Sequence, residues 1–351
     1  MSSILVITPS SSKHLQTQGT LIARKLREDG VQVDILTRAK SSWGRLLDII
    51  FRGFFLMPRY DSVLINVYGE RAFVYETAAI MYGRFWKKHT VALIRSGLMP
   101  KFVQKWPRWT RTILSLSNLV LVPHDFLKLT LSNLGIRIDG VLPNFIELEK
   151  YKFRERTCLV PRFLFLRGAH PIYNPEMALR AFALVQRRYP DALLTIAGPG
   201  TKNSISCQAL VQALNLRNVH FVGQVLKEEI PTLADEHDIH LHTNRVENMP
   251  VSIIEMWACG LPIVGTNVGG MPYLVRNGQD TILVESEDYK AMADACIELL
   301  SNRQLANMLS RNGRRRAEQL IWESVKPKWE RALLLNGKIS KEATAHNQEG
   351  C

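Results

Sequence analysis

Short apolar runs alternate with stretches of helical periodicity through the first 150 residues. The run Ile4–Thr8 precedes a polar loop at Ser10–His14, a helix over Gln18–Glu28, and a second strand at Val31–Thr37 that begins after Gly30. Further strands are predicted at Ser62–Val67, Thr90–Ile94 and Leu119–Val122. This strand–helix–strand spacing is typical of a parallel, doubly wound sheet.

A second series of the same kind follows a stretch of mixed charge without a clear period, residues 144–158. Its predicted strands are Arg162–Leu166, Ala192–Ala197, Asn218–Val222, Asp238–His242 and Pro262–Gly265, and its predicted helices are Pro175–Arg188, Pro250–Ala258 and Tyr289–Leu300. Two such series in tandem predict an α/β protein with two Rossmann-like domains, whose ligand cleft faces the carboxyl ends of the strands.

The domain boundaries follow from these patterns. We expect an N-terminal domain over 1–145, a linker over 146–160 and a C-terminal domain over 161–322. A last helix, 323–337, is expected to cross back to the N-terminal domain. The polar tail 338–351 has few large apolar residues and is expected to be disordered.

Composition narrows the class of protein. Hydrophobic content of 46% and charged content of 22% are those of a globular protein. No run reaches the roughly 18 apolar residues of a membrane span, and we expect no secretory signal because the N-terminus lacks a basic region. The five cysteines are scattered without a CxxC pair, which indicates reduced thiols and a cytoplasmic location rather than a disulfide or zinc framework.

The positive charge lies mainly in the first half. Residues 1–150 carry 21 Lys and Arg against 11 Asp and Glu, a net charge of +10, and residues 151–351 carry 24 against 21, a net charge of +3. A basic first domain favours an anionic partner: an acidic membrane surface, a phosphorylated lipid or a nucleic acid. The alternative is that the charge only keeps the protein solvated.

Two segments bear on that partner. Apolar residues of 43–57 follow helical spacing, with a charged set on the opposite face: Trp43, Leu46, Leu47, Ile50, Phe54 and Met57 against Arg45, Asp48, Arg52 and Arg59. The stretch Lys101–Trp109 interleaves bases and aromatics. Our hypothesis is docking on an anionic membrane, the inner face of the plasma membrane. The alternative is an ordinary core-facing helix, and nucleic acid is disfavoured because no nucleic-acid motif accompanies the bases.

The densest chemical signal is the segment Glu247–Pro272. Pro250 suits the first turn of a helix, so Glu247 lies in the loop before it and Glu255 on it. The helix start presents the N–H groups of Val251 and Ser252, and a second glycine loop, Gly269-Gly270, precedes another helix start. Two helix N-termini form a site for an anion such as a diphosphate, and the two carboxylates can accept hydrogen bonds from sugar hydroxyls.

This segment resembles the E-x7-E signature of the family-4 retaining glycosyltransferases of GT-B fold. The matching residues are Glu247-x7-Glu255 followed by Trp257-Ala258-Cys259-Gly260-Leu261-Pro262-Ile263-Val264. The resemblance implies that Glu247 contacts the donor sugar and Glu255 the nucleotide ribose. It also implies a UDP- or GDP-sugar donor and no cofactor.

Further stretches resemble the same family: Leu142–Ile146, Phe163–Arg167, Ala197–Gly200 and Phe221–Val225. By this resemblance Arg167 binds the diphosphate, and Gly223, Gln224 and Val225 meet the nucleobase. The remaining donor-binding residues expected are Asn248, Met249, Pro250, Val251, Ser252, Gly198, Gly200, Asn174, Gly269 and Gly270.

Two departures from the family pattern concern charge. The family has a Lys about five residues after the Arg, whereas the loop after Arg167 contains none; Arg167 alone, His170 or Asn174 would have to replace it. Ala92–Pro100 resembles a subgroup with L-H-G-G-x-L-P, but Arg95 stands in the His position. An Arg stays protonated and cannot act as a general base. Arg95 is therefore expected to stabilise phosphate charge or hold an acidic acceptor, or else to form a structural ion pair.

The mechanism that the resemblance implies needs little covalent chemistry from the protein. Arg167 and the helix-end amides stabilise the leaving diphosphate, attack occurs on the front face, and the leaving phosphate takes the acceptor proton. The sequence contains no Asp-x-Asp element, which argues against a divalent metal bridging the diphosphate. Asp238, His240 and His242 share one face of a strand and are a metal alternative, against a structural role.

The predicted function is therefore transfer of a hexose-type sugar from a nucleoside-diphosphate sugar to a hydroxyl of a carbohydrate or lipid-linked acceptor, in polysaccharide or glycolipid assembly. Two alternatives remain. One is a non-catalytic GT-B protein that binds a nucleotide sugar or a partner enzyme. The other is an epimerase that uses the same cleft without an acceptor.

Overall fold

The computed structural model describes residues 2–8, 17–36 and 42–334, without the side chains of 42, 43 and 45. The predicted loop at Ser10–His14 and the tail 338–351 lie outside the described residues. The chain divides into two compact units: one joins the chain up to Asn144 with the segment that begins at Trp322, and the other is Phe145–Ile321.

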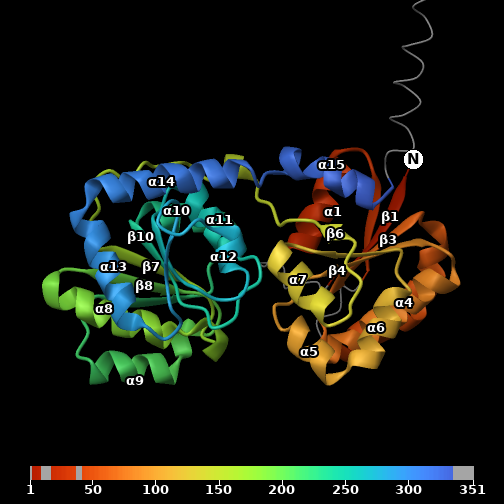
Figure 1. The fold of residues 1–351 in the computed structure, drawn as a ribbon, viewed down its shortest axis with the longest axis horizontal. Coiled ribbons are helices and arrows are strands. Elements are labelled where there is room, and N and C mark those ends of the chain that lie inside the picture. Colours follow the sequence, from red (N-terminus) through yellow and green to blue (C-terminus); the bar gives the residue numbers. More distant parts are fainter. Residues whose placement is uncertain (1, 9–16, 37–41, 335–351) are drawn as a thin grey trace, which may run out of the picture. The chain divides into compact units, whose positions relative to one another are not determined.

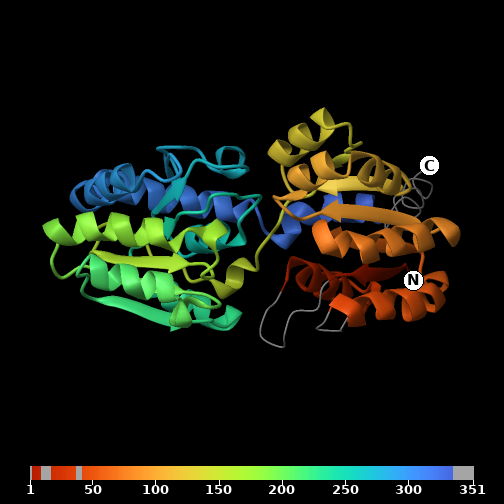
Figure 2. The same cartoon turned by 90° about the horizontal axis from the view of Figure 1, so that it is seen from below.

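The first unit is built on a parallel six-stranded sheet in the order β2-β1-β3-β4-β5-β6. Its strands are β1 (Ser3–Ile7), β2 (Gln32–Leu36), β3 (Ser62–Val67), β4 (His89–Ile94), β5 (Leu119–Val122) and β6 (Gly140–Val141). Its helices are α1 (Gln18–Glu28), α2 (Ser42–Leu47), the π-helix η1 (Asp48–Gly53), α3 (Phe54–Leu56), α4 (Phe73–Phe85), α5 (Met99–Lys105), α6 (Pro107–Ser115), α7 (Asp125–Asn133) and α15 (Trp322–Ala332). Figures 1 and 2 show helices on both faces of this sheet.

Helix α1 illustrates how local sequence determines the elements. Thr17 caps the helix in a reciprocal pair with Thr20, which satisfies N–H groups that the helix leaves open. Leu21, Ile22 and Leu26 recur at helical spacing and are buried against the sheet. The predicted helix and the observed one coincide because cap and periodicity agree.

Helix α15 belongs to the first unit. The indole Nε1 of Trp322 donates to Asp29 at 2.9 Å, and Lys326 pairs with the same carboxylate at 2.9 Å. The helix expected over 323–337 begins at Trp322, directly after Ile321, which pairs with Ile146 as an isolated β-bridge.

The segment 43–57 differs from its prediction. Met57 is buried but Leu47, predicted to share its apolar face, is 52% exposed, and Ile49 and Gly53, which were not in the predicted apolar set, are buried. The winding changes from α to π over Asp48–Gly53, so the period of 3.6 residues that underlies the prediction does not apply there.

The second unit repeats the architecture with the order β12-β11-β10-β7-β8-β9, again all parallel. Its strands are β7 (Arg162–Leu166), β8 (Leu193–Ala197), β9 (Val219–Gly223), β10 (Ile239–His242), β11 (Ile263–Thr266) and β12 (Ile282–Val284). Its helices are α8 (Pro175–Arg188), α9 (Ile205–Ala213), α10 (Ile230–Asp235), α11 (Val251–Ala258), α12 (Met271–Leu274), α13 (Tyr289–Ser301) and α14 (Arg303–Glu318). The predicted α/β class with two Rossmann-like domains is confirmed.

The segment expected to link the domains packs within the second unit. Arg156 is 1% exposed and donates to the carbonyls of Ala234 at 2.9 Å and His237 at 3.0 Å. A buried guanidinium that satisfies backbone carbonyls fixes this segment in the core of the unit. None of the helices in the described part of the chain has the length and apolar character that crossing a bilayer requires.

Candidate functional site: a carboxylate and arginine cluster at the sheet edge

The second sheet reverses its strand order between β7 and β10. From β7 the chain proceeds outward through β8 and β9 and then returns to β10 on the other side. Ligands of open α/β sheets bind at such a switch point, beyond the carboxyl ends of the strands. Arg167 follows β7 directly, and the loop that contains Glu247 follows β10.

Glu247 is held by side chains from both of these strand ends. Its Oε2 accepts from Arg167 Nη2 at 2.9 Å and from Asn244 Nδ2, and it lies 3.0 Å from His242 Nε2. Its Oε1 accepts from the N–H of Asn248 at 2.9 Å. The predicted pair Glu247 and Arg167 is thus brought together, and His242 and Asn244 join it.

The cluster determines the charge of Glu247. Burial raises the pKa of this carboxyl, but Arg167 and the His242 hydrogen bond outweigh burial and bring the pKa down to about 2. Burial also lowers the pKa of His242. The site at neutral pH therefore contains a carboxylate, a guanidinium and a neutral imidazole.

The start of α11 provides open polar groups beside this cluster. Pro250 is the N-cap residue, so Val251 and Ser252 have N–H groups that the helix itself cannot use. The Oγ of Ser252 and the Nε of Arg167 are buried and have no hydrogen-bond partner among the described residues. Buried donors without partners are rare, and an anion would satisfy both.

The glycine loop after β11 touches Glu247 through its backbone. Gly269 has a φ of +53°, and a Cβ there would lie 2.1 Å from the Glu247 carbonyl oxygen. The N–H of Gly270 donates to the same carbonyl at 3.1 Å. The expectation that the Gly270 amide faces a diphosphate is therefore wrong: this loop positions the Glu247 backbone instead.

Glu255 lies on the second turn of α11 and is 3% exposed. Its Oε1 accepts from the Tyr151 hydroxyl at 2.8 Å and forms an ion pair with Lys227. Burial lowers the pKa of Lys227 to about 8, and repulsion from Lys150 and, less, from Arg167 adds to this lowering. Lys227 thus lies in the electrostatic range of Arg167.

Tyr151 and Lys227 are site residues that the sequence did not predict. Lys227 lies only two residues beyond the predicted base-contacting stretch Gly223–Val225, which was the one signal that pointed to it. Tyr151 reaches Glu255 from a position 104 residues away.

The other predicted donor residues occupy the same edge. Gly198 and Gly200 follow β8, Gly223 ends β9 with Gln224 and Val225 beyond it, and Asn248 and Met249 precede α11. Gly198 approaches Arg167 so closely that a Cβ would lie 2.3 Å from the Arg167 carbonyl oxygen.

Asn174 does not replace the missing lysine. It is buried with φ +51°, its Nδ2 donates to Glu287 at 3.0 Å, and its Oδ1 accepts from Arg245 at 3.0 Å. The nearby His170 accepts the N–H of Ile172 at 3.2 Å. Both side chains hold their own loop, and the donor-binding role expected of Asn174 stays a prediction.

The three residues of the metal alternative each have a different partner. Asp238 accepts from Arg154 at 2.8 Å, His240 Nδ1 lies 2.9 Å from the Leu164 carbonyl, and His242 faces Glu247. No group of three potential metal ligands is present in the part of the chain that the structure describes.

Arg95 lies in the first unit, after β4. Its Nε donates to the side-chain oxygen of Asn66 at 2.9 Å, and its Nη1 donates to that of Asn144 at 2.5 Å. Burial lowers its pKa to about 10, and it remains a cation at neutral pH.

Comparisons with known proteins agree with this geometry. The profile of the family described as Glycosyl transferases group 1 matches residues 160–316. The chain is 27% identical over 190 residues to an N-acetyl-alpha-D-glucosaminyl L-malate synthase from Bacillus anthracis, covering 51% of this chain and 48% of that one. It is 27% identical over 203 residues to a D-inositol 3-phosphate glycosyltransferase from Rhodococcus jostii, covering 53% and 45%. The chain thus spans about half the length of these curated relatives.

Solved structures resemble the whole chain. HepE from Anabaena, in complex with UDP and glucose, superposes with a TM-score of 0.78 at 18% identity, over 95% of this chain and 99% of that one. Sucrose-phosphate synthase from Thermosynechococcus elongatus gives 0.76 at 18% identity, over 99% and 100%. These likenesses establish the GT-B fold.

Proposed function

Because residues 160–316 belong to the glycosyl transferases group 1 family, we propose that the protein is a retaining glycosyltransferase that moves a hexose-type sugar from a nucleoside-diphosphate sugar to a hydroxyl acceptor. The observation that carries this proposal is the cluster around Glu247: an ionised carboxylate tied to Arg167, beside a helix start whose buried Ser252 Oγ lacks a partner.

In the proposed reaction the diphosphate lies against Arg167 and the start of α11. Negative charge grows on the leaving oxygen as the glycosidic bond breaks, and donors already aimed at it lower the barrier. Arg167 is held in place by Glu247 and by Tyr173, whose ring centroid lies 5.4 Å from the guanidinium carbon. The front-face attack and the proton transfer to the leaving phosphate rest on the family resemblance.

The two carboxylates divide the sugars between them. Glu247 accepts from donor-sugar hydroxyls and Glu255 from the ribose hydroxyls. His242, neutral because its pKa is lowered by burial, orients Glu247 without competing as a second cation. Ribose hydroxyls at Glu255 would take the place of Lys227, which pairs with that carboxylate.

We assign Lys227 the task of the lysine that is absent after Arg167. An ammonium released from Glu255 by the ribose is free to turn to the adjacent diphosphate, where a point charge suits phosphate oxygens. Its low pKa fits a side chain held in a largely desolvated site together with Arg167.

UDP-sugars are the favoured donors over GDP-sugars. HepE, the structural neighbour with TM-score 0.78, is described with UDP and glucose. The donor is a substrate, and no cofactor enters the proposal.

The acceptor is proposed to be a carbohydrate or lipid-linked hydroxyl, used in polysaccharide or glycolipid assembly by a cytoplasmic protein at the inner face of the plasma membrane. A pocket of about 440 Å³ at the loops after β3 and β4 supports this. Its lining combines aromatic faces with cations: Phe102, Trp106 and Trp109 with Arg71, Lys101 and Lys105.

Isosteric variants at the two carboxylates test the proposal. Turnover of UDP- and GDP-sugars, as transfer or slow hydrolysis, is measured for the wild type, Glu247→Gln, Glu255→Gln and the exposed control Glu298→Gln. We expect Glu247→Gln to lose on the order of 10² in kcat, Glu255→Gln to raise KM, and the control to be unchanged. Undiminished turnover in both site variants would contradict the proposal. A wild type that is stabilised by a sugar nucleotide but turns over none would favour the binding-protein alternative.

A further inference from the structure

A stripe of exposed apolar side chains runs along the outer side of the segment formed by α2, η1 and α3. Leu47, Phe51 and Phe55 are 52%, 61% and 71% exposed and recur every fourth residue. Met81 and Phe85 on the adjoining helix α4 are 51% and 65% exposed. We call these five residues the aromatic stripe. Single exposed apolar residues are ordinary, but a contiguous set marks an interaction surface.

The stripe is not the core-facing side of these helices. That side is made by Ile49, Gly53 and Met57, which are buried. Phe54 packs between the helices, with its ring centroid 5.3 Å from Tyr82 and 5.8 Å from Phe85. The helices therefore have their core contacts already, and Phe55 and Phe85, although they touch Phe54, keep most of their surface exposed.

The segments that carry the stripe are basic in sequence. Residues 44–59 and 77–88 contain six basic residues and one acidic residue, Asp48. Asp48 is paired with Arg52 at 3.0 Å. The side chains of Arg84 and Lys87, in and just after the last turn of α4, have no ion-pair or hydrogen-bond partner among the described residues.

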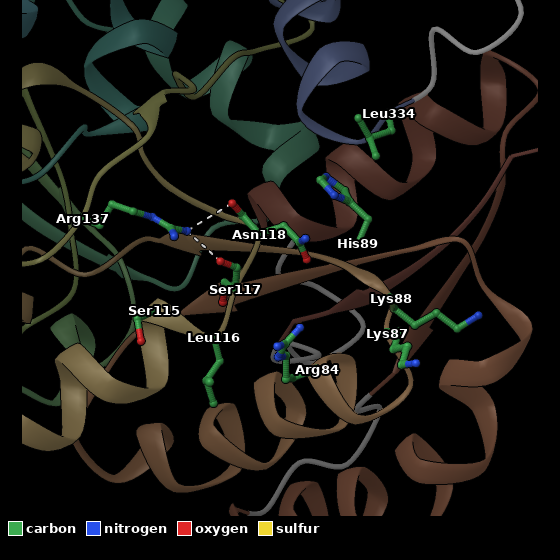
Figure 3. A pocket seen from close by; sticks show the side chains of 10 residues that line it. All are labelled: Arg84, Lys87, Lys88, His89, Ser115, Leu116, Ser117, Asn118, Arg137 and Leu334. Atoms are coloured by element: carbon green, nitrogen blue, oxygen red, sulfur yellow. Dashed lines mark hydrogen bonds between the residues drawn. The ribbon is translucent and has the colours of Figure 1, made fainter.

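These last two residues also line a pocket of about 810 Å³ that Figure 3 shows from close by. Lys88 and His89 share the pocket, and Arg137 reaches into it from another element, held by the Ser117 and Asn118 carbonyls. The end of α4 thus carries apolar residues of the stripe and cations of the pocket side by side in the sequence. An anionic group of lipid-headgroup size fits such a pocket.

Charge decides between the possible occupants. A second copy would meet the stripe through the same surface, and two strongly basic patches in contact repel each other. An anionic bilayer provides the complementary charge together with an apolar interior for Phe51, Phe55 and Phe85.

We propose that the aromatic stripe, with Arg84 and Lys87, is the surface by which the first unit docks on an anionic lipid membrane. This inference rests on the proposed function only for its purpose, which is to bring the enzyme to a membrane-borne acceptor. The docking residues differ in part from those predicted from the sequence: Leu47 is kept, Phe51 and Phe55 are added, and the buried Met57 takes no part.

Flotation with liposomes tests it. The full chain is mixed with vesicles of phosphatidylcholine alone or with about one third phosphatidylglycerol, at low and physiological salt. We expect flotation only with the anionic vesicles. The variant Phe51→Ser/Phe55→Ser/Phe85→Ser should lose binding about tenfold or more at both salt concentrations, and Arg84→Gln/Lys87→Gln mainly at low salt, where exposed charges act most strongly. Ile205→Ser, at an 82% exposed position of the second unit, is the matched control.

Two results would overturn the proposal: wild-type protein that does not float at low salt, or aromatic variants that float like the wild type. Donor hydrolysis in solution is measured on the same variants and should not change, because none of these residues lies in the donor site. A variant that no longer floats but still hydrolyses the donor supports the docking surface. A wild type that hydrolyses no donor counts against the proposed function and leaves the flotation result unaffected.

Discussion

Arg167 Nη2 lies 2.9 Å from Glu247 Oε2, and this ion pair joins the end of β7 to the loop after β10. The two residues are 80 positions apart in sequence and meet because their strands are neighbours at the switch point. The pair does two things at once: it keeps Glu247 ionised and it fixes the direction of the guanidinium. A site that must stabilise a leaving diphosphate benefits from a cation that is oriented before the substrate arrives.

Two replacements of Arg167 separate the effect of its positive charge from that of its planar guanidinium group. We expect Arg167→Gln to lower kcat by 10² or more and to raise the pKa of Glu247, whose main stabilising charge is removed. Arg167→Lys keeps the charge but not the planar fork, so partial activity is expected. The measurement is kcat and KM for the donor together with urea unfolding. An Arg167→Gln variant that folds normally and keeps wild-type kcat would show that Arg167 does not stabilise the leaving diphosphate.

Lys227 gives a prediction with its own pH dependence. The pKa of about 8 means that its charge is lost as the pH rises through 8, so donor affinity should weaken there. Lys227→Met should raise the donor KM about tenfold with less effect on kcat. Lys227→Arg should restore affinity and move the alkaline decline to higher pH, because Arg does not titrate in this range.

Lys290→Met, at an exposed lysine of the same unit, is the control for loss of charge alone. If the donor KM of Lys227→Met stays within twofold of the wild type at pH 7, Lys227 serves only to neutralise Glu255.

The sequence predicted those parts of the site that a motif or a strand end locates. Glu247 and Arg167 each follow a buried apolar run that is typical of a strand. Pro250 and Gly260 mark the two ends of helix α11, which follows Glu247. Strands β6 and β12 were missed because two or three residues are too short to show a period.

Lys227 and Tyr151 were missed for a different reason. Their significance is a contact with Glu255 across 28 and 104 residues, and nothing in local spacing encodes such a contact. The same limit explains Asn174 and Gly270: the sequence placed both in the correct loops, but their hydrogen bonds to Glu287 and to the Glu247 carbonyl appear only in three dimensions.

Two glycines with positive φ form a matched pair for testing the glycine loop. Gly269 has φ +53° and no room for a Cβ beside the Glu247 carbonyl, whereas Gly278 has φ +73° and nothing within 4 Å of a Cβ. Gly278→Ala should cost about 1–2 kcal/mol for the backbone conformation alone and leave activity unchanged. Gly269→Ala should cost more and lower donor turnover, because Glu247 must shift. Equal stability and equal turnover in the two variants would contradict the positioning role of Gly269.

Glu76 predicts how the stability of the first unit depends on pH. It is fully buried on α4 and accepts the N–H groups of Tyr68 at 2.8 Å and Gly69 at 3.2 Å. Burial raises its pKa from 4.5 to about 8, although these hydrogen bonds oppose the rise.

Between these two pH values the unfolded chain has lost the proton that the folded protein keeps, so stability falls as the pH rises, by at most about 1.4 kcal/mol per pH unit. The fall begins near pH 4.5 and ends near pH 8. Glu76→Gln cannot titrate, so its unfolding free energy should vary less over this window, even if the loss of one hydrogen bond makes it less stable overall. Urea unfolding at pH 5, 6.5 and 8 measures both slopes, with the exposed Asp125→Asn as control. A slope in Glu76→Gln as steep as that of the wild type would show that another group carries the pH dependence.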